Sequence, residues 1–526
     1  MADSPGSPAL EGRGVDESTG RRSVPKPAEL ALLAGVFVVA ACGLVYELAA
    51  AALASYVLGD SVLQFSTVIG SYLFAMGVGS WLSRYFKEQL PTQFLRIELL
   101  IALVGGALPA ALLLINAYRP EIFQASLYAM VLLIGTLVGL EIPLVMRILR
   151  QHLGMRQLVS DVLTYDYLGA LAVSIAFPLW LVPQLGLVRT GLLFGFMNLL
   201  VAAWTLWLFR AVVLHVRAYW IVWFLTTVAM ALGWSQANRF TTLAEDRMFG
   251  DTVVLADSTP YQRIVLTNGP WGMRLFLNGN LQFSQQDEYR YHEALVHPVA
   301  SAFGGDGPKK VAVLGGGDGM AVRELLRYPS VESITLVELD PAMTRLFASD
   351  ERLVRLNGAA LQSPRVKVVN EDAFQWLEEV DEVFDIIVVD FPDPTNFSIG
   401  KLYSRSFYAL LSHHLSASGY AVVQSTSPLV ARESFWSVEA TIAAAGLSTR
   451  PYHAHVPSFG EWGFIVASHR PFRMPERLPP GLRFLDMAGL PGLFEFPLDM
   501  QKVPAKVNRL SDQTLVQTYA REWGAD

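Results

Sequence analysis

The chain divides into a first half of long apolar runs and a second half in which short apolar segments alternate with polar ones. Seven runs of about 20 residues or more precede residue 240, and each is long enough to cross a hydrocarbon core as a helix. No polar face recurs in them at the helical period, which disfavours a helical bundle folded in water. We therefore predict a membrane domain over residues 28–237 with about seven transmembrane helices, six or eight being the alternatives. The runs cover residues 30–57, 64–85, 97–117, 123–149, 163–187, 190–210 and 218–236.

The segments that flank and connect these runs differ in positive charge, which bears on orientation. The odd-numbered connections hold little beyond Arg119 and Arg189. Because positive residues favour the cytoplasm, we predict a cytoplasmic N-terminus, and seven crossings would place everything after residue 240 outside. Residues 1–27, rich in Ser, Pro and Gly, are predicted to be a disordered tail. The positive residues of the tail and of the even-numbered connections are Arg13, Arg21, Arg22, Lys26, Arg84, Lys87, Arg96, Arg147, Arg150, Arg156, Arg210 and Arg217.

Four acidic residues lie in or at the ends of the apolar runs: Glu47, Glu98, Glu141 and Asp166. An ionisable group in a membrane is costly, so each is by default a candidate functional residue. For Glu98, close to the start of its run, we expect a place near the interface or a bond to a neighbouring helix. For the other three, helix packing and a further role both remain open. The small residues Gly77–Ser80 predict a close contact between helices.

After residue 240 the pattern becomes that of a soluble α/β protein. Between residues 250 and 286, alternating apolar and polar residues are interrupted by Asn268-Gly269 and Asn278-Gly279, which predicts a small β-hairpin subdomain. Over residues 287–475, strand-like and helix-like segments alternate, which predicts a parallel sheet with helical crossovers, that is, a Rossmann-like domain. Residues 476–526 form a Pro-rich and then weakly helical extension to which the pattern assigns no role.

Composition narrows the functional classes further. The 526 residues are 52% hydrophobic and 17% charged, which a soluble globule of average composition does not match. The single cysteine, Cys42, excludes a disulfide scaffold and any multi-cysteine metal site, and we expect no metal. A net charge of −7 gives no support for nucleic-acid binding.

The clearest chemical signal is a glycine-rich loop between a buried strand and a helix. It contains Gly315, Gly316, Gly317, Asp318 and Gly319. Glycines at this place let the backbone turn tightly and approach a ligand. Nineteen residues beyond the loop, at the end of the next strand, Glu338 can accept hydrogen bonds from both hydroxyls of a ribose. The pattern favours a ligand that contains adenosine.

Acidic residues follow the next two strands as well. The third strand runs into Glu371-Asp372-Ala373, where an adenine amino group would find an acceptor, and the fourth ends in Asp390, with Asp393 close behind. Carboxyl ends of parallel strands meet at one crevice, where such sheets bind ligands. Together with Asp318 in the glycine loop, these carboxylates disfavour a pyrophosphate and predict a cationic ligand.

These residues carry a family resemblance over about residues 250–465. The ordered motifs resemble those of the polyamine aminopropyltransferases, the spermidine synthases, and the helices-first architecture is similar to that of the membrane-bound bacterial members. The resemblance implies a Rossmann-like fold of the S-adenosylmethionine-dependent methyltransferase type. It also implies transfer of an aminopropyl group from decarboxylated S-adenosylmethionine to putrescine, giving spermidine and methylthioadenosine. The motifs are Tyr261-Gln262, DEYRYHEALVHP (287–298), GGGDG, VELD, DxxDP and VPSFGEWGF (456–464).

The resemblance also implies roles for individual residues. On the donor side, Glu338 would hold the ribose, Asp372 and Ala373 the adenine, and Gln262 the nucleoside end, while Asp318 would bind the amine of the aminopropyl arm.

On the acceptor side, Tyr291 and His292 would line the amine channel, Asp393 would hold an acceptor amine, and Asp390 would be the catalytic base. Residues 391–405 are long enough to close over the site. The donor would be a co-substrate, with no resident cofactor. Family members form homo-oligomers, so a dimer is expected by resemblance.

Two departures from the family pattern fall on the acceptor side. Thr395-Asn396-Phe397 stands where a Gly-Pro is usual, and Phe459 stands where a tyrosine serves the acceptor amine. One alternative is therefore a transferase that acts on a different amine or transfers a methyl group. The other is a membrane protein that binds polyamine or nucleoside for transport or sensing, without turnover. Asp390 together with Asp318 counts against methyl transfer, and Asp390, Asp393 and Tyr291 count against a protein that only binds.

The expected location is the inner membrane of a bacterial cell. The side on which the catalytic domain lies stays open at this point. The charge pattern places that domain outside, whereas the donor nucleoside is made in the cytosol.

Overall fold

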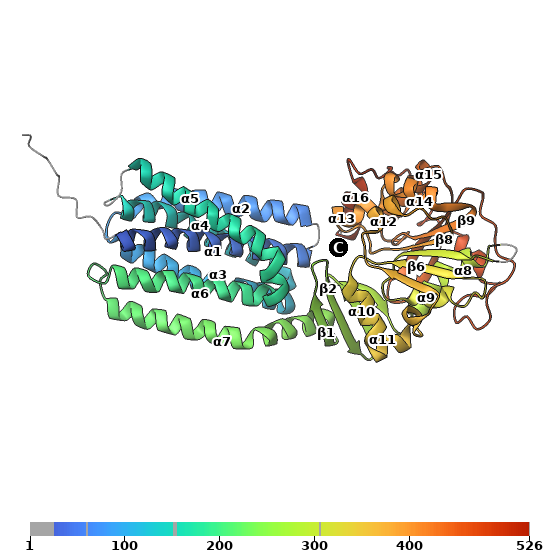
Figure 1. The fold of residues 1–526 in the computed structure, drawn as a ribbon, viewed down its shortest axis with the longest axis horizontal. Coiled ribbons are helices and arrows are strands. Elements are labelled where there is room, and N and C mark those ends of the chain that lie inside the picture. The colour runs from blue at the N-terminus through green and yellow to red at the C-terminus, as the bar shows by residue number, and fades with distance from the viewer. Residues whose placement is uncertain (1–25, 59–60, 151–154, 304–306, 525–526) are drawn as a thin grey trace, which may run out of the picture.

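The computed structural model describes residues 26–58, 61–150, 155–303 and 307–524. Residues 1–25, most of the predicted disordered tail, lie outside them. A bundle of long helices forms one end of the molecule and an α/β domain forms the other, with a small sheet between them (Figure 1). The helical N-terminal region and the Rossmann-like C-terminal domain expected from the sequence are both present.

Seven α-helices make up the bundle within the described residues, and successive helices run in opposite directions (Figure 1). By length and composition alone, six stretches are apolar enough to cross a membrane, one of them holding both α5 and α6. The π-helical turn Phe177–Leu181 and Gly186, at φ +71°, join these two helices. The non-helical residue Gly186 lies just before the predicted break between residues 187 and 190. The helices are α1 Lys26–Leu58, α2 Ser61–Leu82, α3 Leu90–Tyr118, α4 Phe123–Leu149, α5 Met155–Ala176, α6 Val182–Leu208 and α7 Val216–Phe249.

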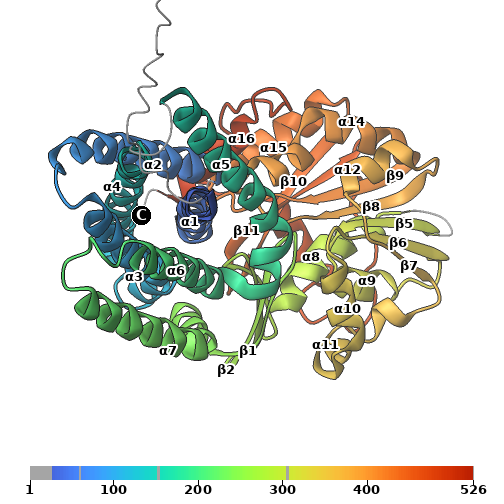
Figure 2. The ribbon, with the colours of Figure 1, turned by 60° about the vertical axis from the view of Figure 1, so that its left-hand side comes forward.

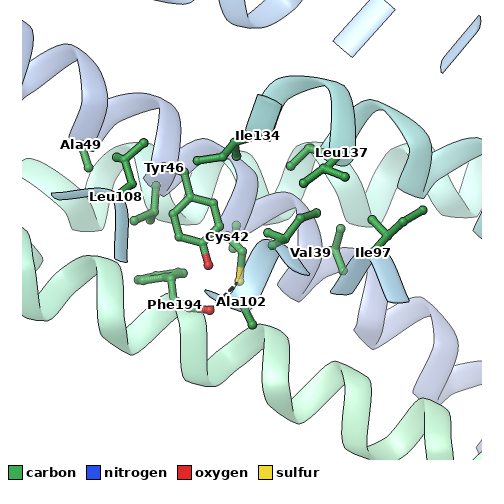
Figure 3. Close-up of a cluster of buried hydrophobic side chains, with 14 of the residues drawn as sticks. Val39, Cys42, Tyr46, Ala49, Ile97, Ala102, Leu108, Ile134, Leu137 and Phe194 are labelled. Atoms are coloured by element: carbon green, nitrogen blue, oxygen red, sulfur yellow. Dashed lines mark hydrogen bonds between the residues drawn. The ribbon is translucent and has the colours of Figure 1, made fainter. Parts of the chain in front are cut away.

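Small residues allow the helices to approach closely. A Cβ on Gly79 of α2 would lie 2.0 Å from the carbonyl oxygen of Thr136 in α4, which confirms the close contact predicted for Gly77–Ser80. Figure 3 shows the centre of the bundle, where the Cys42 thiol donates a hydrogen bond to the carbonyl of Phe194 at 3.4 Å. Cys42 is a buried thiol packed among apolar side chains.

The acidic residues of the bundle are buried to different degrees. Glu98 and Glu141, on α3 and α4, are 0% and 1% exposed, and their carboxyl groups interact with one another. Glu98 therefore lies two turns inside α3 and faces a carboxyl group of a neighbouring helix, while its place relative to the membrane interface stays a prediction. Glu47 is 8% exposed, and Asp166 is half-buried.

A four-stranded antiparallel sheet follows the bundle, with its strands in chain order. Asn278 and Gly279 form a two-residue turn at φ +50° and +84°, as the sequence predicts. Asn268-Gly269 instead ends a strand, and Pro270-Trp271 makes that turn. One face of the sheet packs against the α/β domain through Phe283 and its neighbours. The strands are β1 Thr252–Ser258, β2 Arg263–Gly269, β3 Gly272–Leu277 and β4 Asn280–Ser284.

The α/β domain is built on a seven-stranded sheet in the order β10-β11-β9-β8-β5-β6-β7. β5 to β9 are parallel, as predicted, while β11 and β10 add an antiparallel edge that the sequence pattern did not reveal. The strand order reverses between β5 and β8, and this switch point is where such sheets bind ligands. The strands are β5 Lys310–Gly315, β6 Ser333–Val337, β7 Val366–Val369, β8 Phe384–Asp390, β9 Leu415–Gln424, β10 Ser448–Val456 and β11 Gly460–Ser468.

Helices cover both faces of this sheet (Figure 2). α8 and α9 belong to the apolar core on one face, and α12, α14 and α15 to the core on the other. The helices are α8 Glu288–Ala300, α9 Met320–Leu325, α10 Pro341–Ser349, α11 Glu351–Leu356, α12 Ala373–Glu379, α13 Phe397–Gly400, α14 Arg405–His414, α15 Arg432–Ala444 and α16 Thr514–Trp523.

Candidate functional site

The glycine loop runs from the end of β5 along the end of β8. Gly315, Gly316 and Gly319 have φ of +80°, +64° and +75°, a region that side chains other than glycine rarely adopt. A Cβ on Gly315 would lie 2.3 Å from the carbonyl oxygen of Asp390, and the Gly316 N–H donates to that carbonyl at 3.1 Å. The loop is thus held at the switch point, where only glycine fits.

Glu338 follows β6 and closes against this loop. Its two carboxylate oxygens accept the Gly317 N–H at 3.2 Å and the Asp340 N–H at 3.0 Å. Burial raises the pKa of Glu338 to about 7, because few groups here compensate the charge. The glycine loop and Glu338 therefore lie side by side, as expected. Hydroxyl groups of a ligand that donate to Glu338 would stabilise its ionised form.

Gln262 reaches the same crevice from the small sheet. Its amide donates to Asp340 Oδ2 at 3.0 Å, and the Thr259 hydroxyl donates to the same oxygen at 2.8 Å. Asp340 also caps α10 by accepting the Ala342 N–H at 2.9 Å. Asp340 belongs to the VELD motif, yet no role was expected for it.

Asp372 follows β7 and caps α12, accepting the Phe374 N–H at 2.9 Å. Its other oxygen accepts a charged hydrogen bond from Lys401 Nζ at 2.6 Å. Ala373 is buried beside it. Lys401 was not anticipated, because a lysine inside a loop has no sequence pattern that marks it.

Asp318, within the glycine loop, and His292 of α8 interact with one another and are 9% and 2% exposed. His292 Nδ1 lies 2.9 Å from Glu288 Oε2, and Arg323 donates to both oxygens of Glu288 at 3.0 and 2.9 Å. Burial disfavours the charge of His292, yet the hydrogen bond to Glu288 and the charge of Asp318 raise its pKa above the ordinary value. Burial raises the pKa of Asp318. Glu288 and Arg323 are additional site residues that sequence reasoning missed.

Asp390 ends β8 and receives a hydrogen bond from the Tyr291 hydroxyl at 2.6 Å. Burial, reinforced by the charge of Asp318, raises the pKa of Asp390 to about 6, although His292 and the Tyr291 hydrogen bond act in the opposite direction. A carboxylate with a pKa close to neutrality is suited to general base catalysis.

Asp393 lies three residues further along, in the loop between β8 and α13. It accepts a hydrogen bond from the Gln424 amide at 3.2 Å, and the nearby hydroxyls of Thr426 and Tyr519 favour its ionised form. Burial raises its pKa. Tyr519 belongs to the C-terminal extension, to which the sequence assigned no role.

Taken together, the predicted residues converge on the carboxyl ends of β5 to β8, although their individual roles remain predictions. Asp318 and Asp390 interact electrostatically, and so do Asp318 and Glu338. This concentration of carboxyl groups disfavours an anion and suits a ligand with a nucleoside end and a cationic arm. The Tyr291 ring also stands near Phe459, with ring centroids 6.0 Å apart.

Comparison with known proteins agrees with this geometry. A family model described as the spermine/spermidine synthase domain matches residues 288–474. Polyamine aminopropyltransferase 2 of Ralstonia nicotianae is 53% identical over 500 residues, which cover 94% of this chain and 98% of that protein. The polyamine aminopropyltransferase of Leptospira interrogans is 48% identical over 498 residues, 94% of this chain and 99% of that protein.

A solved structure of spermidine synthase in complex with the transition state analogue AdoDATO matches with a TM-score of 0.43 and 24% identity, over 47% of this chain and 85% of that chain. The two full-length relatives span the helical bundle as well as the α/β domain. On that whole-chain similarity, this chain is an enzyme of the polyamine aminopropyltransferase family.

Proposed function

We propose that this enzyme transfers the aminopropyl group of decarboxylated S-adenosylmethionine to putrescine, giving spermidine and methylthioadenosine. The observation that carries the proposal is Asp390, a carboxyl with a pKa of about 6 that is held by Tyr291 beside the acidic glycine loop. Neither a pyrophosphate-binding dehydrogenase nor a simple methyltransferase needs such a group next to Asp318.

The donor enters as a co-substrate, with its nucleoside over β6 and β7. Glu338 accepts the ribose hydroxyls, and Asp372 with Ala373 contacts the adenine. Gln262, fixed by Asp340, borders the nucleoside end. Asp318 binds the ammonium of the aminopropyl arm, which directs the carbon next to the sulfonium toward Asp390.

The acceptor amine lies between Asp390 and Asp393, with Tyr291 and His292 lining its path. An alkyl amine has a pKa near that of lysine, about 10, so it arrives protonated and cannot attack. The sulfonium repels the ammonium, and Asp390 takes its proton. The nitrogen lone pair then forms the new C–N bond while the C–S bond breaks. The bonding electrons remain on sulfur, which becomes the neutral thioether of methylthioadenosine. Holding the amine nitrogen in line with the carbon next to sulfur supplies much of the rate enhancement.

The test supplies purified protein with decarboxylated S-adenosylmethionine and, in parallel, putrescine, cadaverine or spermidine. The products are identified by mass spectrometry. We expect equal amounts of spermidine and methylthioadenosine with putrescine. A larger yield with another amine would identify that amine, instead of putrescine, as the acceptor. Methylation of any amine would identify a methyltransferase. Donor binding without product would favour a transport or sensing protein.

We further propose that α1 to α7 span the inner membrane of a bacterial cell. Their length and apolar composition support this, as do the exposed apolar side chains on the bundle. The N-terminal end of the bundle carries Arg84, Arg147, Arg150 and Arg217, which favours the cytoplasmic side. With seven crossings, the catalytic domain lies on the other side. A dimer is proposed on the family resemblance alone.

Orientation is testable because Cys42 is the only native cysteine and is buried. Glu332→Cys, on an exposed side chain of the catalytic domain, is labelled with a membrane-impermeant maleimide in intact spheroplasts. Wild-type protein is the control. Labelling before lysis is expected, whereas labelling only after lysis would place the domain in the cytoplasm. Mass measurement in detergent tests the dimer.

A further inference from the structure

The C-terminal helix α16 reaches the acceptor side of the site at Asp393. The Tyr519 hydroxyl lies beside the Asp393 carboxylate, and each of the two groups shifts the pKa of the other. Four residues later, on the same face of the helix, the Trp523 indole N–H donates to the Thr426 hydroxyl at 3.3 Å, and Thr426 in turn favours the ionised form of Asp393. The extension therefore approaches this carboxyl through Tyr519 and, by way of Thr426, through Trp523.

The other donor to Asp393 is heavily shared. The two N–H groups of the Gln424 amide serve the Phe391 carbonyl, the Tyr403 hydroxyl at 2.8 Å and Asp393 at 3.2 Å. Because two N–H groups serve three acceptors, the three hydrogen bonds differ in length, and the one to Asp393 is the longest. Burial together with the charge of Asp393 raises the pKa of Tyr519, which keeps the proton on the hydroxyl beside that carboxylate.

Separate contacts fix α16 in place. The Glu522 carboxylate accepts the N–H groups of Glu433 and Ser434 at 2.7 and 3.0 Å, at the start of α15. At the other end of α16, the Leu515 N–H donates to Asn508 Oδ1 at 3.3 Å. The position of Tyr519 is thus set by ties at both ends of its helix, independently of Asp393.

The same extension holds the segment that was predicted to cover the site. Asn508, 0% exposed, donates through its amide to the carbonyls of Gly400 and Tyr403, both at 3.0 Å. A Cβ on Gly400 would lie 2.4 Å from Val516 Cγ2, so α13 and α16 are in tight contact. The two helices lie together at the edge of the α/β domain that faces the helical bundle (Figure 1).

We propose that Tyr519 is a positioning residue for the acceptor amine. This inference rests on the proposed function, since it assigns the amine to Asp393. By donating to one side of the carboxylate, the hydroxyl keeps Asp393 ionised and turns its free lone pairs toward the amine channel. Phe459 and Trp462, with ring centroids 5.1 Å apart, supply an apolar wall near that channel but no hydroxyl from Phe459. The C-terminal extension thereby completes the acceptor half of the site.

The test is Tyr519→Phe, which removes one hydroxyl and preserves the ring. Hydrogen bonds to charged groups contribute about 1.5–3 kcal/mol, so KM for the amine should rise roughly tenfold or more. KM for the donor should stay within about twofold. The control is Gln517→Ala, an exposed residue of the same helix, which should leave both constants unchanged. Calorimetric titration of putrescine into protein loaded with methylthioadenosine gives a second reading that does not require turnover.

Unchanged amine KM and amine affinity in Tyr519→Phe would overturn the inference. Equal losses for donor and amine, with a lower melting temperature, would show a structural role only and would also overturn it. If the wild-type protein transfers to no amine at all, the proposed function fails instead. That outcome is recognised before any variant is compared.

Discussion

Removing the Tyr291 hydroxyl should move the pH dependence of the reaction without disturbing donor binding. The hydroxyl lies 2.6 Å from Asp390 Oδ1 and lowers the pKa of that carboxyl by donating to its ionised form. Tyr291→Phe removes this hydrogen bond while leaving the ring, which packs against Phe459 and Phe464. Asp390 should then hold its proton more tightly.

The size of the effect follows from the same contact. A hydrogen bond to a buried charged group contributes about 1.5–3 kcal/mol, and about 1.4 kcal/mol corresponds to one pKa unit. The pKa of Asp390 should therefore rise from about 6 to roughly 7–8. At pH 7 the ionised share would fall from about nine-tenths to between about a half and a tenth. Activity at pH 7 should drop about two- to tenfold and recover by about pH 9.

The assay measures methylthioadenosine release between pH 5 and 9.5 and plots the ratio of variant to wild-type kcat/KM for the amine. The titration of the free amine is common to both proteins and cancels in this ratio. Tyr452→Phe is the matched control, because that buried hydroxyl donates to the Ala294 carbonyl at 2.7 Å and touches no carboxylate. A ratio that is low but independent of pH, or a Tyr452→Phe profile of the same shape, would refute the reasoning.

Two further predictions concern the donor side and the glycine loop. Glu338→Gln should weaken methylthioadenosine binding about tenfold or more in calorimetry, because one carboxylate oxygen that accepts from a ribose hydroxyl becomes an amide donor; unchanged affinity would remove Glu338 from the ribose site. Gly316→Ala would place a Cβ 3.0 Å from Asp390 Oδ2 at a φ of +64°. It should lower kcat by more than about tenfold with circular dichroism unchanged, and normal turnover would contradict the proposed place of the loop.

Much of the site could be predicted because it depends on local pattern and strand polarity. A buried strand that runs into Gly315–Gly319 fixes one edge of the crevice, and the next strand ends beside it at Glu338. Parallel strands bring their carboxyl ends together, so Asp372 and Asp390 follow from the alternation of elements alone. The seven-helix count likewise follows from the length of the apolar runs.

The remainder depends on contacts between distant segments, which no periodicity encodes. Lys401 meets Asp372 through a loop, and Arg323 meets Glu288 from another helix. Tyr519 reaches Asp393 across 126 positions of chain, and its helix is only 10 residues long. The antiparallel edge formed by β10 and β11 was missed as well. The π-helical turn Phe177–Leu181 after α5 was not anticipated either, because an apolar run does not show where helical geometry changes.

The most direct test of the account compares wild-type protein with Asp390→Asn at saturating donor and amine. Asparagine keeps the shape of the side chain and an acceptor for Tyr291 but cannot take a proton at neutral pH. We expect methylthioadenosine formation to fall by on the order of 10²–10⁴-fold, the usual contribution of a general base, while affinity for methylthioadenosine stays the same. Formation within about tenfold of wild type, with the same amine product, would show that Asp390 is not the base on which this mechanism depends.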